Sequence, residues 1–267
     1  MFSHKRTRGQ RDLTHIFFGC LRYTITGLGI VSISLTSIMI YKELLQLPWL
    51  QVKKIQVEGC VNQTPAEILD IADIGPQVNL LSLNLNQICQ QLESSPWIEK
   101  AQVKRTFPDQ LYIGISERKP AALINLNQLH LVDRNGVIFK KVDHQEGQGL
   151  PIVTGIDWES LMNHKKKYTI LINEALSLLS LFEQKGFHKS YISEININPS
   201  LGLTVYTTNN TLQIVMGFAP FQKKCNRLYV IMDDLNNKNL TAQKIDLNYQ
   251  HKAFVKIKES SKTKKSI

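Results

Sequence analysis

The chain has 267 residues, about enough for two domains, and its 43% hydrophobic and 20% charged residues are close to globular averages. This composition argues against a disordered or collagen-like chain and against a transporter with many membrane spans. The net charge is +10, but residues 1–22 carry +4 and residues 252–267 carry +5, which leaves +1 for the long stretch between them. Because the excess lies in two tails, we expect no phosphate-binding surface over the globular part and no nucleic-acid partner.

The first predicted element is a membrane-spanning helix over residues 23–41. These 19 residues contain no charged side chain, and Arg22 and Lys42 bracket them. At about 1.5 Å per residue, such a helix spans roughly the 30 Å core of a bilayer. A soluble amphipathic helix would show a charged face, and a cleaved signal peptide would end in a small-x-small site, which residues 38–42 lack. We expect an uncleaved anchor with residues 1–22 as a basic cytoplasmic tail, because basic residues cluster before the span.

The cysteines fit a disulfide framework poorly. Cys20 lies in or beside the membrane, so three cysteines, an odd number, remain outside. A pair between Cys60 and Cys89 is possible in an oxidising compartment, but free buried thiols are favoured.

A small domain is predicted next, over residues 50–120. The run 52–60 alternates like a half-buried strand, and Thr64-Pro65-Ala66-Glu67 is a capping box that opens a helix. A second helix opens at Asn84. Two further strands alternate over Ala101–Arg105 and Leu111–Ile115, with a turn at Pro108-Asp109 between them. The predicted order is therefore strand, helix, helix, strand, strand.

The second domain, predicted over residues 121–258, is mainly antiparallel β with two helices, and residues 259–267 form a basic C-terminal tail. Asn135-Gly136 predicts a hairpin turn between strands at 129–132 and 137–140. Apolar periodicity predicts the remaining elements, which are helices at 173–185 and 221–235 and strands at 192–197, 201–207, 211–216 and within 244–257. The expected fold class of the whole chain is α+β.

The sequence shows no chemical motif. Asp233-Asp234 lacks a third metal ligand, and adjacent helix residues diverge by about 100°. Cys225 with Arg227 has no supporting histidine motif, so a buried thiol is favoured over a nucleophile. We therefore expect no catalytic residue, metal, cofactor or small-molecule substrate.

Several ordered blocks resemble the FtsQ/DivIB family of cell-division proteins. The segments SPWIEKAQVKR at 95–105, FPDQLYI at 107–113 and ERKPA at 117–121 are similar to its polypeptide-transport-associated (POTRA) domain. LVDRNGVIF at 131–139, LPIVTG at 150–155 and IDLNY at 245–249 are similar to its later blocks, in the same order. The sequence departs from the family at Asn248, where arginine is usual, and at Lys252 and Ile257, which replace a common glycine and tryptophan.

The resemblance implies a non-enzymatic scaffold of the division septum in the inner membrane. Such a protein links early and late division proteins and binds FtsB- and FtsL-type single-span partners. Two alternatives stay open at this point. One is an envelope-assembly protein whose POTRA domain escorts unfolded chains, and the other is a membrane-tethered enzyme of unrecognised type.

Two groups of partner-binding residues are expected. In the resembling family the final strand lies at a sheet edge where FtsB docks by strand addition, and the matching candidates are Tyr249, Lys252, Ala253, Phe254, Val255 and Lys256. Phe254 is expected to face outward, and the lysines either pair with acidic partner residues or only protect the edge from aggregation. The second group, on the outer strand face of the small domain, comprises Lys104, Arg105, Asp109 and Glu117, expected to be exposed. Plain surface charge is the alternative for this group.

Overall fold

The computed structural model describes residues 9–75, 78–143, 147–186, 191–208, 212–250 and 252–258. The chain divides into two compact units, one up to Ser116 and one from Glu117. Three expected segments lie wholly or partly outside the described residues: the basic tail at 259–267, the first eight residues of the tail at 1–22, and the first residue of the strand at 211–216.

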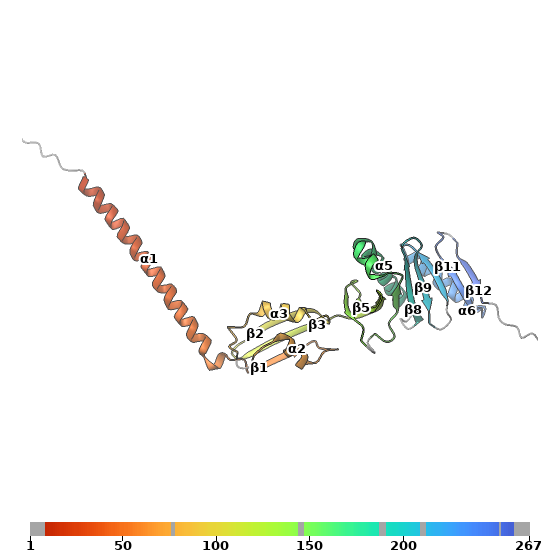
Figure 1. Cartoon of the computed structure of the whole chain (residues 1–267), viewed down its shortest axis with the longest axis horizontal. Helices are drawn as coiled ribbons and strands as arrows, with labels where there is room; N and C mark the ends of the chain where they lie inside the picture. Colours follow the sequence, from red (N-terminus) through yellow and green to blue (C-terminus); the bar gives the residue numbers. More distant parts are fainter. Residues whose placement is uncertain are drawn as a thin grey trace, which may run out of the picture. The chain divides into compact units, whose positions relative to one another are not determined.

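The first unit begins with a long helix, α1, over Gly9–Gln46 (Figure 1). Its apolar stretch Leu21–Leu45 has a mean hydropathy of 1.6 and no buried residue, so it is consistent with a single-pass membrane anchor. Hydroxyl groups inside this stretch donate hydrogen bonds to carbonyl oxygens one turn earlier, at Thr26, Ser34, Thr36 and Ser37. These polar groups are thereby satisfied without water, as a bilayer requires.

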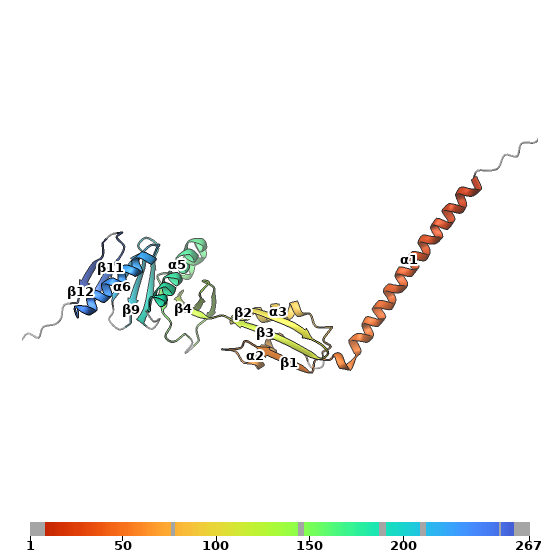
Figure 2. The same cartoon turned by 180° about the vertical axis from the view of Figure 1, so that it is seen from behind.

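The first unit then forms a three-stranded sheet with two helices. Its elements are the 3₁₀ turn Pro48–Leu50, β1 Lys54–Glu58, α2 Pro65–Ala72, α3 Leu85–Glu93, β2 Ile98–Thr106 and β3 Gln110–Glu117. The strand order is β1-β3-β2, with β1 parallel to β3. The two helices lie against one face of the sheet (Figures 1 and 2). The predicted order of strand, helix, helix, strand, strand is confirmed.

Local sequence signals explain these elements. The Thr64 side chain accepts from the amide of Glu67, and the Glu67 carboxylate accepts from the amide of Thr64 at 2.7 Å, which completes the predicted capping box. Asn84 caps α3 by accepting from the Gln87 amide. Side chains from all five elements then share one core, which includes Ile68, Ile88, Leu92, Val103, Leu111 and Ile113.

The second unit is built on a nine-stranded mixed sheet. Its strands are β4 Pro120–Asn125, β5 Leu129–Asp133, β6 Ile138–Lys141, β7 Ile152–Thr154, β8 Ile192–Asn198, β9 Gly202–Thr207, β10 Gln213–Gly217, β11 Ala242–Asp246 and β12 Phe254–Ile257. Their order is β12-β11-β10-β9-β8-β7-β4-β5-β6. Three neighbouring pairs are parallel (β4–β7, β7–β8 and β10–β11), and the other five are antiparallel.

The helices of this unit are α4 Trp158–Asn163, α5 Lys165–Gln184 and α6 Gln222–Asn237. The sequence predicted two, and the helix it missed is α4, a six-residue element capped by Asp157, which accepts from the Ser160 amide. So short a helix offers too few turns for a periodic pattern. The predicted hairpin is confirmed, because β5 and β6 pair antiparallel and Gly136 has a φ of +78° in their turn.

The sheet of the second unit has one covered and one open face. Buried residues of α5 and α6 share a core with alternate residues of the strands, including Ile195, Val205, Ile214 and Ile245. The intervening strand residues, such as Tyr206, Gln213 and Lys244, are half-buried on the other face. The strands β6 and β12 form the two edges of the sheet. The last described strand of the chain therefore lies at an edge, beside α6 (Figure 2).

Candidate functional site

The edge strand β12 has one neighbour, β11, and no other described strand pairs with its outer side. The register sets Phe254 opposite Asp246 and Lys256 opposite Lys244. Val255 lies opposite Ile245 and, like Ala253, packs half-buried against the core. Phe254 is 56% exposed, so its expected outward placement is confirmed. The outer N–H and C=O groups of such a strand can pair with an added strand.

Two aromatic rings stand together at the start of β12. Tyr249, 55% exposed, and Phe254 make an edge-to-face contact with ring centroids 5.1 Å apart. With Val255 and the charged side chains of Lys244, Asp246 and Lys256 they line a shallow depression of about 340 Å³. An exposed aromatic pair beside an open strand edge offers an apolar anchor point for a partner.

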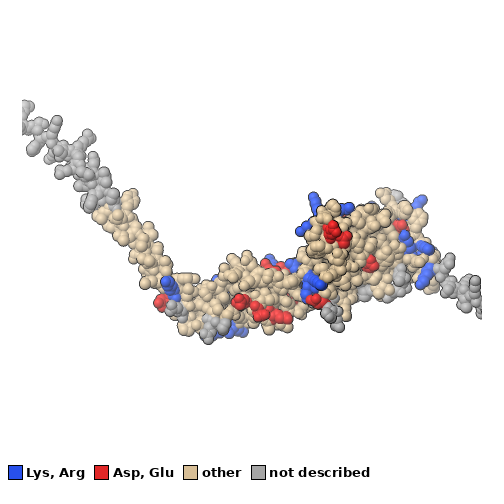
Figure 3. Space-filling view, in the orientation of Figure 1, with Lys and Arg blue, Asp and Glu red and all other residues tan. Residues whose placement is uncertain are grey.

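Lysine side chains surround this anchor point. Lys244 and Lys256 are direct cross-strand neighbours, and Lys252 is exposed just before β12. Figure 3 shows Lys and Arg side chains gathered at the end of the second unit where β11 and β12 lie. Like charges directly opposite each other are unfavourable in a sheet, so an acidic side chain placed between them would relieve the repulsion.

Arg227 of α6 supports the loop that leads into β12. Its Nη1 group donates to the carbonyl oxygens of Tyr249 (2.9 Å), Gln250 (3.0 Å) and Lys252 (3.3 Å), and Nη2 donates to that of Leu247 at 3.2 Å. Sequence reasoning missed this role of Arg227, because its contacts lie 20 to 25 residues away in the chain. No local pattern predicts contacts at that separation.

The end of β10 supports the other side of the same loop. Gly217 has a φ of +64°, and a Cβ there would overlap the side-chain oxygen of Asn248. Lys224 donates from Nζ to the carbonyls of Met216 and Phe218, both at 2.7 Å. Burial, together with the nearby positive charge of Arg227, lowers the pKa of Lys224 below its ordinary value. On this side of the loop, Asn248 packs closely against Gly217, at the position where the resembling family usually has arginine.

The four candidates in the small domain do not form one exposed group. Lys104 is exposed, as expected. Arg105 is half-buried and donates to the carbonyls of Leu80 (2.7 Å) and Leu83 (2.6 Å). Asp109 is half-buried with Lys53 3.6 Å away, and Glu117 is only 7% exposed. The expected exposure was therefore wrong for these three residues.

The alternation of the strands could have revealed two of these errors. Ala101 and Val103 are buried, and Arg105 continues their parity along β2. Glu117 likewise continues the buried series of Leu111, Ile113 and Ile115 in β3. A charged side chain on the inward parity of a strand indicates a structural hydrogen-bonding role rather than a free surface.

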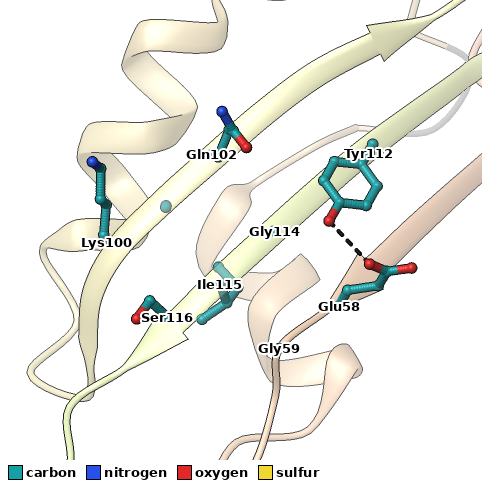
Figure 4. Close-up of a pocket in the computed structure, with 9 residues that line it drawn as sticks. Glu58, Gly59, Lys100, Gln102, Tyr112, Gly114, Ile115 and Ser116 are labelled. Carbon is teal, nitrogen blue, oxygen red and sulfur yellow. Dashed lines mark hydrogen bonds between the residues drawn. The ribbon is translucent and has the colours of Figure 1, made fainter.

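The open face of the small sheet is hollowed instead around Gly114, which the sequence did not single out (Figure 4). Lys100 and Gln102 of β2, Tyr112 of β3 and Glu58 of β1 line this depression of about 500 Å³. The Tyr112 hydroxyl donates to Glu58 at 3.0 Å, and this bond raises the pKa of the phenol. The hollow is shallow, and Lys104 lies on the same strand as three of its lining residues, Lys100, Ala101 and Gln102.

The residues that the sequence analysis weighed for metal or nucleophile chemistry, Cys225 and Asp233-Asp234, all lie on α6. No group of three or more His, Cys, Asp or Glu residues among the described residues could hold a metal ion. Asp234 pairs with Lys238 at 2.8 Å along α6, as a solvated helix residue does. Cys225 is buried, and burial raises the pKa of its thiol to about 11, so it is a neutral core residue.

Comparison with known proteins places both units in one family. Residues 50–118 match the FtsQ-type POTRA domain, and residues 122–248 match the C-terminal domain of the cell division protein FtsQ/DivIB. The cell division protein FtsQ of Anaeromyxobacter sp. (strain K) is 35% identical over 200 residues, which cover 74% of this chain and 68% of the relative.

Two further relatives extend the match. FtsQ of Syntrophotalea carbinolica is 29% identical over 254 residues, covering 95% of this chain and 90% of the relative. FtsQ of Geobacter sp. (strain M21) is 31% identical over 208 residues, covering 78% and 76%. With its N-terminal apolar helix, its POTRA unit and its larger mixed sheet, the chain belongs to the FtsQ/DivIB family of non-enzymatic cell-division proteins and is a divisome component.

Proposed function

We propose that the chain is a scaffold of the division septum that joins early and late division proteins and binds FtsB- and FtsL-type single-span partners. The observation that carries the proposal is the open edge of β12 with its exposed Tyr249–Phe254 pair. Membership of the FtsQ/DivIB family supports a role in cell division. We further propose residues 50–120 and 121–258 as the limits of the two extracytoplasmic domains.

The FtsB-type partner docks by adding a strand to β12. Backbone groups from Lys252 to Lys256 pair with the added strand, while Ala253 and Val255 keep the edge seated on the core. Phe254 and Tyr249 supply apolar contact, and the lysines on both strands favour acidic side chains in the partner.

Phe254→Lys tests the docking edge. The substitution removes half of the aromatic pair and adds a lysine on the face that carries Lys244 and Lys256, while the half-buried Ala253 and Val255 are unchanged. We expect binding of the FtsB-type partner to weaken by about 2 kcal/mol, roughly 30-fold, as for a hot-spot residue. The measurement is co-purification and titration of the partner with the full chain in detergent.

Leu201→Lys is the matched control, because Leu201 is also an exposed apolar residue of the second unit but lies in the turn between β8 and β9. It should leave binding unchanged. If Phe254→Lys and a chain truncated after Asp246 both bind the partner like wild type while still folded, the edge is not the docking site.

The membrane topology is the second part of the proposal. The apolar helix crosses the inner membrane once, with the basic tail in the cytoplasm and the residues after Lys42 outside. Protease added to spheroplasts should therefore remove everything beyond about Trp49 and spare an N-terminal tag. A mature protein that begins after Lys42 would show instead that the helix is a cleaved signal.

Recruitment to the septum is assigned to the open face of the small sheet. Lys104 is the remaining exposed member of the original four candidates, on the strand that also lines the hollow around Gly114. A fluorescent fusion of the chain should form a band at midcell. A uniform envelope signal in dividing cells would contradict a septal scaffold.

A further inference from the structure

One helix side chain holds several carbonyl oxygens of the loop between β11 and β12. The loop start is also held by the Leu247 amide, which donates to the Val215 carbonyl, and by the Asn248 amide, which donates to the Asp246 side chain. Arg227 projects from α6, and its two terminal nitrogens donate to four carbonyl oxygens of this loop at 2.9 to 3.3 Å. Its Nε is buried and has no acceptor among the described residues. The four loop carbonyls therefore set the orientation of the guanidinium.

Few other contacts order the segment that follows this loop. β12 is four residues long, pairs on one side, and meets a register shift between Ala242 and Lys244 of β11. Its inward side chains Ala253 and Val255 are only half-buried. Short strands with one neighbour are marginal by themselves, so the position of β12 depends strongly on how its loop is fixed.

The loop also carries one of the two docking rings. Tyr249 accepts a hydrogen bond from Arg227 through its carbonyl oxygen, while its ring contacts Phe254. The planar guanidinium presents several donors in a fixed fork, which suits it to fix several carbonyls at once. Fixing the backbone at Tyr249 therefore also fixes where its ring meets β12.

We propose that Arg227 is the positioning residue of the docking edge, acting through the loop rather than by touching the added strand. By holding the carbonyls of Leu247, Tyr249, Gln250 and Lys252 it keeps β12 and the Tyr249–Phe254 pair in the binding-competent arrangement before a partner arrives. This inference rests on the proposed docking function. In this proposal α6, through Arg227, controls how readily β12 can accept an added strand.

The effect on binding depends on the fraction of molecules whose loop and β12 are in the binding-competent arrangement. When the competent arrangement is only a fraction of the molecules, the apparent affinity falls by that fraction. Without the fork, the loop regains part of its backbone freedom, and we expect the competent fraction to fall to about one tenth of the molecules. Arg227→Gln should then bind about tenfold more weakly, through a slower association rate with little change in dissociation.

The test uses the full chain in lipid nanodiscs and the extracytoplasmic segment of the FtsB-type protein of the same organism as the probe. Variants are Arg227→Gln and Arg227→Lys, which keeps the charge but offers donors from a single point. Arg134→Gln is the control, because Arg134 makes an ion pair with Glu183 at 3.0 Å elsewhere in the second unit. Binding kinetics and amide hydrogen exchange are measured for each variant.

We expect exchange in residues 247–257 to accelerate in Arg227→Gln while β8 and β9 stay protected. Association should slow about tenfold, Arg227→Lys should be intermediate, and Arg134→Gln should match wild type. Unchanged binding in Arg227→Gln would overturn the proposal. Faster dissociation without faster exchange would also overturn it, since Arg227 would then contact the partner directly. If Arg227→Gln does not fold, Arg227→Lys is judged by the same criteria.

The exchange measurement needs no partner, so the two proposals can fail separately. Faster exchange of the loop in Arg227→Gln, with a wild-type chain that does not bind the FtsB-type segment, would leave Arg227 as the loop's support and remove the docking function. Normal binding by wild type with no effect of Arg227→Gln would remove only the positioning role.

Discussion

Each of the two sheets uses an arginine to hold backbone carbonyls, but with different consequences. In the small sheet Arg105 donates to the carbonyls of Leu80 and Leu83, in the segment that leads into α3. In the large sheet Arg227 donates to carbonyls of an exposed loop beside the edge strand. The first arginine therefore supports the core of its unit, and the second supports a surface. The role of each arginine therefore depends on whether the carbonyl groups that it binds belong to a core segment or to an exposed loop.

The strongest test of this comparison is Arg105→Ala. The substitution removes two charge-assisted hydrogen bonds and leaves the carbonyls of Leu80 and Leu83 without these donors, which should cost about 3 kcal/mol of unfolding free energy in the small unit. Thermal or denaturant unfolding of the full chain measures it, with exchange of the small-unit amides as the local readout.

The neighbouring Lys104→Glu provides the control for Arg105→Ala. Lys104 is exposed, so its reversal should change stability by less than about 0.5 kcal/mol and should reduce the midcell band if the small sheet recruits the chain. Equal stability of Arg105→Ala and wild type would remove the contrast between the two arginines.

The next test concerns the core face of α6, from which Arg227 projects on another side. Cys225 has its thiol pKa raised to about 11 by burial, against an ordinary value of 9.0. A raised folded-state pKa contributes stability that is complete below pH 9 and is lost as pH rises toward 11. The stability difference between wild type and Cys225→Ala should therefore shrink by about 2 kcal/mol across this range.

Chemical denaturation of wild type and Cys225→Ala between pH 8 and 11 measures that change. A stability difference that stays constant with pH would show that the thiol is not buried in the folded chain. α6 would then be less firmly seated than its hold on the loop requires.

The smallest expected effect comes from a charge reversal on the edge strand β12 itself, rather than on the arginine that supports its loop. Lys256→Glu replaces a like-charged cross-strand pair with an opposite pair, which should stabilise the hairpin by a few tenths of a kcal/mol. Binding of the proposed FtsB-type partner should weaken by about 1 kcal/mol, chiefly through slower association, and the loss should diminish at high salt. Association rates at two salt concentrations measure it. If the loss of partner binding is the same at both salt concentrations, Lys244 and Lys256 have no electrostatic role in binding.

Much of the fold was predictable because local signals determine it. The capping box at Thr64, the cap at Asn84 and the Asn135-Gly136 turn each fix an element within a few residues, and the structure shows all three. The outward placement of Phe254 follows from alternation along one strand. Arg227 was not predictable, because its role depends on a loop about 20 residues later whose path only the folded sheet defines. The predicted exposure of Glu117 was wrong for another reason. Its charge was given more weight than its position in β3, where it continues the alternation of the inward-facing residues.

Lys244 and Lys256 also bear on what the edge rejects. An open strand is a template for any extended chain, including β12 of a neighbouring copy. Pairing of two such edges would bring a second Lys256 onto a face where Lys244 and Lys256 already oppose each other. Like charges opposite each other are unfavourable in a sheet, so the two lysines disfavour pairing of this edge with a copy of itself relative to a strand of opposite charge.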